Sequence, residues 1–306
     1  ILGQFRDVNA TASVERVLRK LASGKAKMIL SKREPRLPSP TFVKAYLDAF
    51  RPKAAPSISD DAPQGDQTLK RAFEALEAQD YAHSLSYFQE ALQQGLSTKE
   101  LEATALNMHG TFMFVMGEAK RAQEDLDRST ELCPENVQTW VKKASVHVEL
   151  GDKDAAMADF DRAVALNADD PDIYYHRGQV HFILGEFEAA MSDYSKSTSL
   201  DDTFIFSQVQ HAVASYKLGN IARSTAEFCR ILKKFSDSSE SYNYFGELML
   251  DQQRHEDAVA NFDKSIALEQ AKPKGKNVLP MINKALVLFQ WKQDLSGAEQ
   301  LCRDAL

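Results

Sequence analysis

Histidines and cysteines are the first side chains in this sequence that could bind a metal ion or act in catalysis. The chain has seven His and three Cys among 306 residues. Neither the HExxH spacing of zinc proteases nor a CxxC pair occurs. Cys133, Cys229 and Cys302 lie far apart, which indicates a reduced, cytosol-like compartment. We therefore expect neither a metal site nor a cofactor.

Adjacent carboxylates are the other group that could do chemistry, as a general acid and base. They occur at Asp169-Asp170 and Asp201-Asp202, each shortly before an apolar helical segment. An Asp in that place caps the first turn of the helix, and we expect capping rather than proton transfer. The sequence also lacks a glycine-rich phosphate loop and a GxSxG motif. These observations predict a protein that is not an enzyme.

The elements that position these residues follow a repeat of 34 residues, from residue 103 to residue 272. Positions within each repeat are counted from its first residue. The side chains at positions 8 and 20 are small, and the side chain at position 24 is large. Position 8 is Gly110, Ala144, Gly178, Ala212 and Gly246, and position 20 is Ala122, Ala156, Ala190, Ser224 and Ala258. Position 24 is Leu126, Phe160, Tyr194, Phe228 and Phe262. This pattern is typical of the tetratricopeptide (TPR) repeat, a pair of antiparallel helices A and B. The predicted fold is an all-α, right-handed superhelix.

The array has about seven repeats, the last of them partial. The predicted boundaries are residues 65–98, 103–136, 137–170, 171–204, 205–238, 239–272 and 278–306. Residues 1–34 hold a predicted amphipathic helix, which could cap the array or fill its groove. Residues 35–64 are a predicted proline-rich linker with a short helix at 41–50. Position 15 lies in the turn between helices A and B, and in the five repeats between residues 103 and 272 it is glycine except at Gln253, where we expect slight strain.

The repeat also assigns a place to four of the histidines. His109 and His211 occupy position 7, and His147 and His181 occupy position 11. Both positions face a neighbouring helix, so we interpret these side chains as packing residues rather than ligands.

Charge is distributed unevenly along the chain. Residues 1–56 hold 12 Lys and Arg against 4 Asp and Glu, whereas residues 57–306 hold 25 against 40. The acidic repeats would repel nucleic acid and attract basic peptides. The alternative is that the charge only keeps a large solenoid soluble. No apolar run is long enough to span a membrane.

A TPR array binds its partners in the groove lined by helix A, chiefly at positions 2, 5, 9, 12 and 13. The candidate peptide-binding residues are those at positions 5, 9 and 12: Asn107, Thr111, Phe114, Tyr175, Gln179, Phe182, Val209, Val213, Tyr216, Asn243, Glu247 and Phe289. This wall is largely apolar with a few amides and one acid, which suits an extended or helical hydrophobic segment. An aromatic residue at position 12 is, however, common in TPR repeats of every kind.

A second pattern can be tested directly, the carboxylate clamp with which some TPR proteins hold the C-termini of Hsp70 and Hsp90. The clamp needs Lys at position 5 and Arg at position 6, and no repeat has either. Asp66 and Asp172 at position 2 would repel a carboxylate. We therefore expect no chaperone clamp in these repeats.

Several stretches resemble the seventy-kilodalton receptor of the mitochondrial outer-membrane translocase (TOM complex). The strongest are YYHRGQ at residues 174–179 and QWKQDL at residues 290–295, with LPS at residues 37–39 ahead of the short helix. The insertions before the second and seventh repeats also fall where that family departs from strict period. The resemblance covers essentially the whole chain.

The resemblance implies a C-terminal receptor fragment that binds hydrophobic, carrier-type mitochondrial precursors without catalysis. Its place would be the cytosolic face of the outer membrane, with other TOM subunits as partners. The membrane anchor and the Hsp70/Hsp90 clamp of the family would precede this chain, and residues 1–34 would trail from that clamp. The alternative is a generic TPR scaffold that binds a single partner helix, and a third possibility is the regulatory arm of an enzyme.

Overall fold

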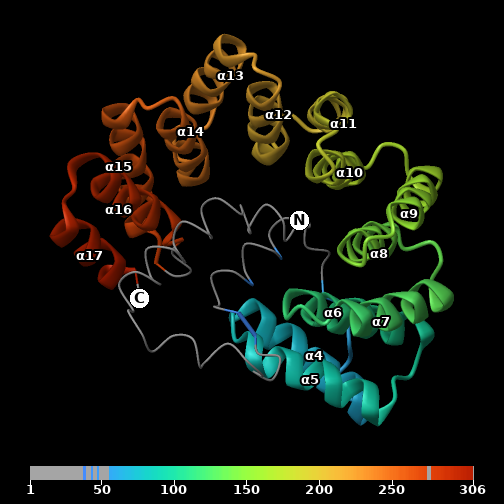
Figure 1. The fold of residues 1–306 in the computed structure, drawn as a ribbon. Coiled ribbons are helices and arrows are strands. Elements are labelled where there is room, and N and C mark those ends of the chain that lie inside the picture. The colour runs from blue at the N-terminus through green and yellow to red at the C-terminus, as the bar shows by residue number, and fades with distance from the viewer. Residues whose placement is uncertain (1–36, 39–42, 44–46, 48–54, 274–276, 306) are drawn as a thin grey trace. The chain divides into compact units, whose positions relative to one another are not determined.

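The computed structural model describes residues 37, 38, 43, 47, 55–273 and 277–305. Fourteen helices, labelled α4 to α17, and no strands occur in residues 55–273 and 277–305 (Figure 1). The predicted all-α solenoid of helix pairs is confirmed. None of the helices in these ranges combines the length and the apolar composition needed to cross a bilayer.

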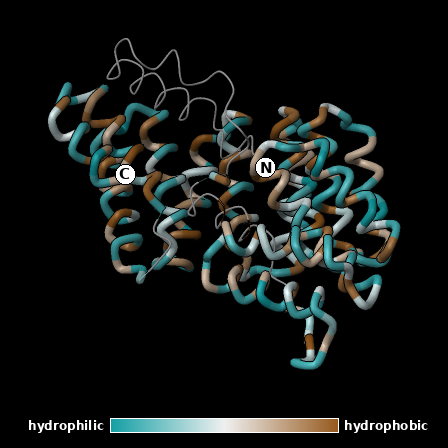
Figure 2. The backbone as a smooth tube through the Cα atoms, turned by 90° about the horizontal axis from the view of Figure 1, so that it is seen from below, coloured by the Kyte–Doolittle hydropathy of each residue, from teal (hydrophilic) through white to brown (hydrophobic). Residues whose placement is uncertain are grey.

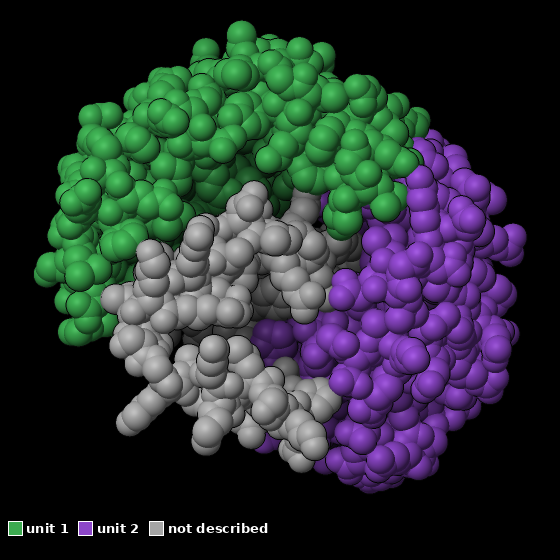
Figure 3. All heavy atoms as spheres, viewed as in Figure 1, with its two compact units in different colours: residues 1–32, 181–306 green, residues 33–180 purple. Residues whose placement is uncertain are grey.

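The helices belong to two compact units, shown in purple and green in Figure 3. The N-terminal unit comprises the described residues up to residue 180, and the C-terminal unit comprises the described residues from 181 to 305. The N-terminal unit contains α4 (Gln64–Glu77), α5 (Tyr81–Gln94), α6 (Lys99–Val115), α7 (Ala119–Leu132), α8 (Val137–Glu149), α9 (Lys153–Leu166) and most of α10 (Pro171–Ile183). The C-terminal unit contains α11 (Phe187–Leu200), α12 (Ile205–Lys217), α13 (Ile221–Lys234), α14 (Ser239–Asp251), α15 (His255–Ala271), α16 (Leu279–Lys292) and α17 (Leu295–Asp304).

The predicted N-terminal helix lies outside the described residues, as does most of the predicted linker. Of the predicted short helix at residues 41–50, only Val43 and Leu47 are described. Both residues are helical, and Val43 is buried.

Apolar side chains form the core between the helices of residues 55–305, and Figure 2 shows hydrophobic and hydrophilic stretches alternating along the helices. The large residues at repeat position 24 form the centre of this core: Leu126, Phe160, Tyr194, Phe228 and Phe262 are each at most 1% exposed. The alanines at positions 8 and 20 are fully buried against them. A small residue at each of these positions lets paired helices approach closely enough for the large ring to fill the remaining space.

Serine occupies some small positions because its hydroxyl finds a backbone acceptor in the paired helix. Ser224 at position 20 donates to the carbonyl of Ala212 at 2.7 Å, and Ser84 donates to that of Ala72 at 2.9 Å. A buried hydroxyl with a partner costs little, so Ser and Ala are interchangeable at this contact.

The turn between helices A and B ends helix A with a residue in the left-handed region. Gly117, Gly151, Gly185 and Gly219 have φ between 77° and 85°. Gln253 has φ of 60°, and its turn forms the same two hydrogen bonds as the glycine turns, Gln253 N to Leu250 O and Arg254 N to Met249 O, both 2.9 Å. Gln79 and Gln293 also have positive φ. The strain that we expect at Gln253 is therefore steric, because a residue with a Cβ adopts a backbone conformation that favours glycine.

Candidate functional site

Two candidate groove residues of the N-terminal unit, Asn107 and Thr111, contact a buried lysine, Lys142 of α8. Its ammonium group donates to Asn107 Oδ1 at 2.7 Å and to Thr111 Oγ1 at 2.9 Å, both on α6. Asn107 in turn donates to Thr139 Oγ1 at 2.8 Å, and Lys142 is only 5% exposed. We call Asn107, Thr111 and Lys142 the Lys142 cluster. In this cluster a buried cation donates hydrogen bonds to two predicted groove residues.

The C-terminal unit has a matching cluster around an acid. Asn243 and Glu247 of α14 occupy the same repeat positions as Asn107 and Thr111, and Asn283 of α16 corresponds to Lys142. Asn283 donates to Glu247 Oε1 at 2.7 Å and to Asn243 Oδ1 at 3.0 Å, and Asn243 donates to Glu247 at 2.7 Å. We call these three residues the Glu247 cluster. Its formal charge is opposite to that of the Lys142 cluster.

The apolar candidates differ in how much of each side chain is accessible. Phe114 and Val209 are 2% and 1% exposed, so their side chains belong to the core in this structure. Four others, all in the C-terminal unit, are half-buried: Phe182, Val213, Tyr216 and Phe289. Val213 and Tyr216 pack against the core that surrounds Phe228 and Phe262. Among the candidate residues, the partly exposed apolar side chains therefore lie in the C-terminal unit.

Tyr216 and Phe182 each have a defined neighbour. The Tyr216 hydroxyl donates to Asp251 Oδ2 at 2.6 Å. Burial, together with this bond to a carboxylate, raises the pKa of Tyr216 to about 12. The ring of Phe182 meets that of Phe187 edge to face, with centroids 5.1 Å apart. Both rings are held in place rather than free to rotate into solvent.

The two candidates of α10 in the N-terminal unit are buried polar side chains. Tyr175 is 6% exposed and packs edge to face on His176, with ring centroids 5.0 Å apart. Gln179 is 1% exposed, and neither its amide oxygen nor its amide nitrogen has a hydrogen-bond partner among the described residues. An unsatisfied buried amide is costly, so Gln179 is a candidate for a hydrogen bond to a bound peptide backbone.

Three of the four histidines at positions 7 and 11 form a hydrogen bond with a carboxylate of the paired helix B, whereas His181 Nδ1 lies 2.7 Å from Glu186 Oε2 in the turn before α11. His109 Nδ1 lies 2.7 Å from Asp125 Oδ2, and His211 Nδ1 lies 3.0 Å from Glu227 Oε2. The same repeat position 23 supplies the acid for His147, whose Nδ1 lies 2.7 Å from Asp159. Burial raises the pKa of Asp159, against the opposing effects of Lys143 and His147. No group of three or more possible metal ligands occurs in residues 55–273 and 277–305.

The paired carboxylates take structural roles, although not all as predicted. Asp170 Oδ1 accepts from the backbone N–H of Asp172 at 3.0 Å and so caps the first turn of α10. Asp201 Oδ1 instead accepts from Thr203 N at 2.8 Å, within the turn before α12. Asp202 Oδ2 accepts from Lys234 Nζ at 2.8 Å, which ties the same turn to α13. The prediction of a helix cap thus fails at the second pair, because the turn itself takes up the first carboxylate.

Sequence reasoning missed two residues of the groove clusters, Lys142 and Asn283. Both occupy position 6 of the repeat that follows the two groove residues they contact. The available signal was a polar or charged residue at this position beside polar residues at positions 5 and 9 of the preceding repeat.

Comparisons with known proteins agree with this architecture. The model of a TPR repeat matches residues 144–185, and that of a tetratricopeptide repeat matches residues 171–204. The mitochondrial import receptor subunits TOM70 of Mus musculus and Homo sapiens are each 27% identical to this chain over 329 aligned residues. The alignment covers 100% of this chain and 53% of each relative, so the chain spans about half the length of the curated relatives it matches.

Solved structures show the same similarity. The crystal structure of yeast Tom70 aligns with a TM-score of 0.81 and 26% identity, over 99% of this chain and 64% of that one. A tetratricopeptide repeat protein from Parabacteroides merdae aligns with a TM-score of 0.59 and 16% identity, over 79% of this chain and 91% of that one, a likeness of fold alone. The resemblance to the seventy-kilodalton translocase receptor is confirmed over the whole chain.

Proposed function

We propose that this chain is the precursor-binding part of a mitochondrial import receptor and catalyses no reaction. The observation that carries the proposal is the similarity to TOM70 along the entire chain, in sequence and in structure. Its place would be the cytosolic face of the outer membrane, with other subunits of the translocase as partners. Hsp70 and Hsp90 would act through a clamp whose residues these repeats lack.

Hydrophobic, carrier-type precursors would bind on the A helices of the C-terminal unit, at the end of α10 and on α12 and α16. Phe182, Val213, Tyr216 and Phe289 support this because they combine groove positions with partial exposure. A hydrophobic segment that covers such rings gains about 25 cal/mol per Å² of apolar surface removed from water. The Glu247 cluster would favour basic residues that flank the segment.

The test is a variant that makes this surface polar while the fold is retained. Phe182→Glu combined with Tyr216→Gln removes both rings, and glutamine at position 216 avoids placing a second carboxylate beside Asp251. We expect at least a tenfold loss of binding to a purified carrier precursor, because two aromatic contacts are lost. Binding is measured by pull-down of the labelled precursor, and helical content by circular dichroism.

The matched control changes two apolar residues outside the predicted groove positions. Leu184 and Ile221 are 40% and 46% exposed, and the double variant Leu184→Glu, Ile221→Gln makes an equivalent change of polarity. It should bind the precursor normally. Unchanged binding by the groove variant, or selective binding of a single partner protein in place of several precursors, would contradict the proposal.

A further inference from the structure

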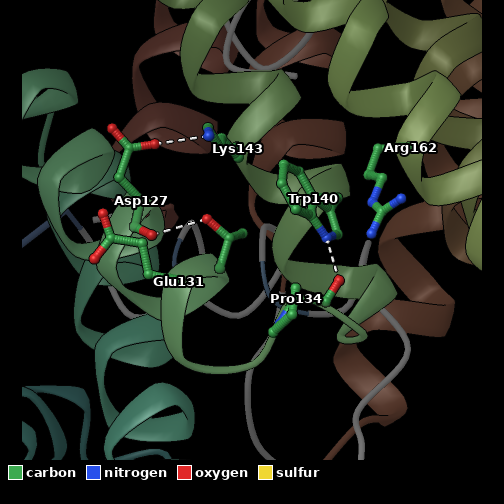
Figure 4. A pocket seen from close by; sticks show the side chains of 7 residues that line it. Asp127, Glu131, Pro134, Trp140, Lys143 and Arg162 are labelled. Carbon is green, nitrogen blue, oxygen red and sulfur yellow. Dashed lines mark hydrogen bonds and ion pairs between the residues drawn. The ribbon is translucent and has the colours of Figure 1, made fainter.

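A pocket of about 570 Å³ opens on the N-terminal unit, lined by residues of α7, α8, α9 and the turn before α8 (Figure 4). Its lining residues are Asp127, Thr130, Glu131, Pro134, Trp140, Lys143 and Arg162. None of them occupies one of the groove positions of helix A. We call it the Trp140 pocket, and it is separate from the surface proposed to bind precursors.

The indole of Trp140 is held in a fixed orientation at the centre of the pocket. Its Nε1–H donates to the carbonyl oxygen of Pro134 at 2.8 Å, so the polar edge of the ring is already satisfied. The next repeat has the same arrangement, in which the Tyr174 hydroxyl donates to Ala168 O at 2.9 Å, but Tyr174 is buried. Trp140 is half-buried and lines an open pocket. Recognition at Trp140 would therefore use the face of the ring.

The charged groups around the ring are neutralised except for one. Lys143 Nζ lies 2.8 Å from Asp127 Oδ1 and 5.1 Å from the centroid of the Trp140 ring. Glu131 Oε2 lies 3.1 Å from Arg128. Arg162 is exposed and forms no hydrogen bond or ion pair within the described part of the chain. The view in Figure 4 shows Trp140 between Lys143 and Arg162. The unpaired charge of the pocket is thus one guanidinium, which lines the same pocket as the Trp140 ring.

We propose that the Trp140 pocket binds an acidic peptide segment of a partner protein. A carboxylate of the segment pairs with the Arg162 guanidinium, and an adjacent apolar side chain packs on the Trp140 ring. A guanidinium binds carboxylates in a bidentate geometry, and a tryptophan face offers a large apolar area at low entropic cost. Tryptophan and arginine are also the residues that contribute most often to binding energy at protein interfaces.

The repeat supplies a matched control for Arg162. Repeat position 26 is basic in five consecutive repeats, at Arg128, Arg162, Lys196, Arg230 and Lys264, and each of these side chains is exposed. Arg230 has the same charge and repeat position, but Gln208 stands at position 4 of its repeat, where Trp140 stands in the repeat of Arg162. The change Arg230→Gln therefore removes a charge without touching an aromatic pocket.

The experiment follows the two indole N–H resonances by NMR, since the chain contains only two tryptophans. A Trp291→Phe variant assigns the resonance of Trp140. The probe is the capped peptide Ac-Gly-Glu-Phe-Gly-amide, and its Gln counterpart tests the carboxylate. We expect a saturable shift of the Trp140 resonance alone. Arg162→Gln should weaken binding about tenfold, as the loss of one charge-assisted pair implies, and Arg230→Gln should leave it unchanged.

The proposal would be overturned by an unmoved Trp140 resonance at the highest soluble peptide concentration, by equal affinity for the Glu and Gln peptides, or by equal affinity of the Arg162→Gln variant. A shift produced by vesicles of anionic phospholipid but not by the peptide would also overturn it, since the ligand would then be a membrane surface. Because Arg162 is exposed, its variant retains the dispersed amide spectrum of the folded chain, and loss of binding reports on the pocket.

Discussion

The Lys142 cluster and the Glu247 cluster occupy the same repeat positions in the two units and carry opposite charge. In the first, a lysine of one repeat donates to an asparagine and a threonine of the preceding repeat. In the second, an asparagine donates to an asparagine and a glutamate at those same positions. Both clusters join positions 5 and 9 of one repeat to position 6 of the next, so the difference in charge comes from the side chains.

This comparison shows how a repeat protein varies its recognition surface. The small and large core positions are constrained by packing between helices, and they hold similar residues in every repeat. Positions 5, 9 and 6 meet across neighbouring repeats, where several polar combinations satisfy the same hydrogen bonds. One array can therefore hold a basic residue in one unit and an acidic residue in the other, each in a cluster built from the same repeat positions.

The largest effect that we predict comes from reversing the charge of the Lys142 cluster. In Lys142→Glu, a buried carboxylate would face the oxygens of Asn107 and Thr111, and we expect a loss of about 3 kcal/mol or more. The corresponding change in the other unit, Asn283→Lys, brings an ammonium group to Glu247 and should alter stability by less than about 1 kcal/mol. The midpoint of urea unfolding, followed by circular dichroism, measures both.

Lys264→Glu is the control for this pair of variants, because it reverses the charge of an exposed lysine. It should change stability by less than about 0.5 kcal/mol. Equal losses in Lys142→Glu and Asn283→Lys would show that the two clusters do not differ in their electrostatics.

An intermediate effect is expected from the close contact at repeat position 8. A Cβ at Gly246 would lie 2.7 Å from the ring of Phe262, although the same position holds Ala144 and Ala212 in other repeats. We expect Gly246→Ala to destabilise the C-terminal unit by about 1–3 kcal/mol through overpacking. Phe262→Leu should cost less in the Gly246→Ala background than in the wild type, because the smaller side chain relieves the clash.

Gly110 in the N-terminal unit is the matched site without an aromatic neighbour. A Cβ there would lie 3.0 Å from Asp125 Cβ and 3.2 Å from the Ala122 carbonyl oxygen. Gly110→Ala should destabilise as well, but no substitution of a single ring can relieve it. A double-mutant cycle of urea midpoints checks the contrast, and additive effects of the changes at positions 246 and 262 would refute it.

The smallest effect concerns the turn that ends helix A. Gln253 has φ of 60°, whereas Gly151 has φ of 84° in the equivalent turn. Gln253→Gly should stabilise the protein by about 0.5–1 kcal/mol, because glycine adopts positive φ without a steric cost. Gly151→Gln should destabilise by a similar amount, and thermal unfolding measures both. A lower melting temperature for Gln253→Gly would mean that the glutamine side chain makes a compensating contact.

Much of the helical core was predictable from the sequence. For the candidate site, the sequence predicted which repeat positions line the groove, but not which of their side chains are exposed. The pattern at positions 8, 20 and 24 identified buried residues, because each of these contacts lies within one repeat or between adjacent repeats of fixed geometry. The groove list, by contrast, includes Phe114, which is buried, together with Phe182, which is half-buried, at the same position 12. Exposure at that position depends on the size of neighbouring side chains, which periodicity does not encode.

The amino-acid sequence alone therefore sets the period, the pairing of helices and the identity of the core, since helix packing tolerates only certain sizes at certain spacings. Tertiary structure decides which of the remaining residues contact one another. Lys142 meets Asn107 across 35 residues, and Arg162 lines one pocket with Trp140 of another helix and has no acidic partner within the described part of the chain. Such contacts depend on where long side chains end in space, and several neighbours compete for each of them.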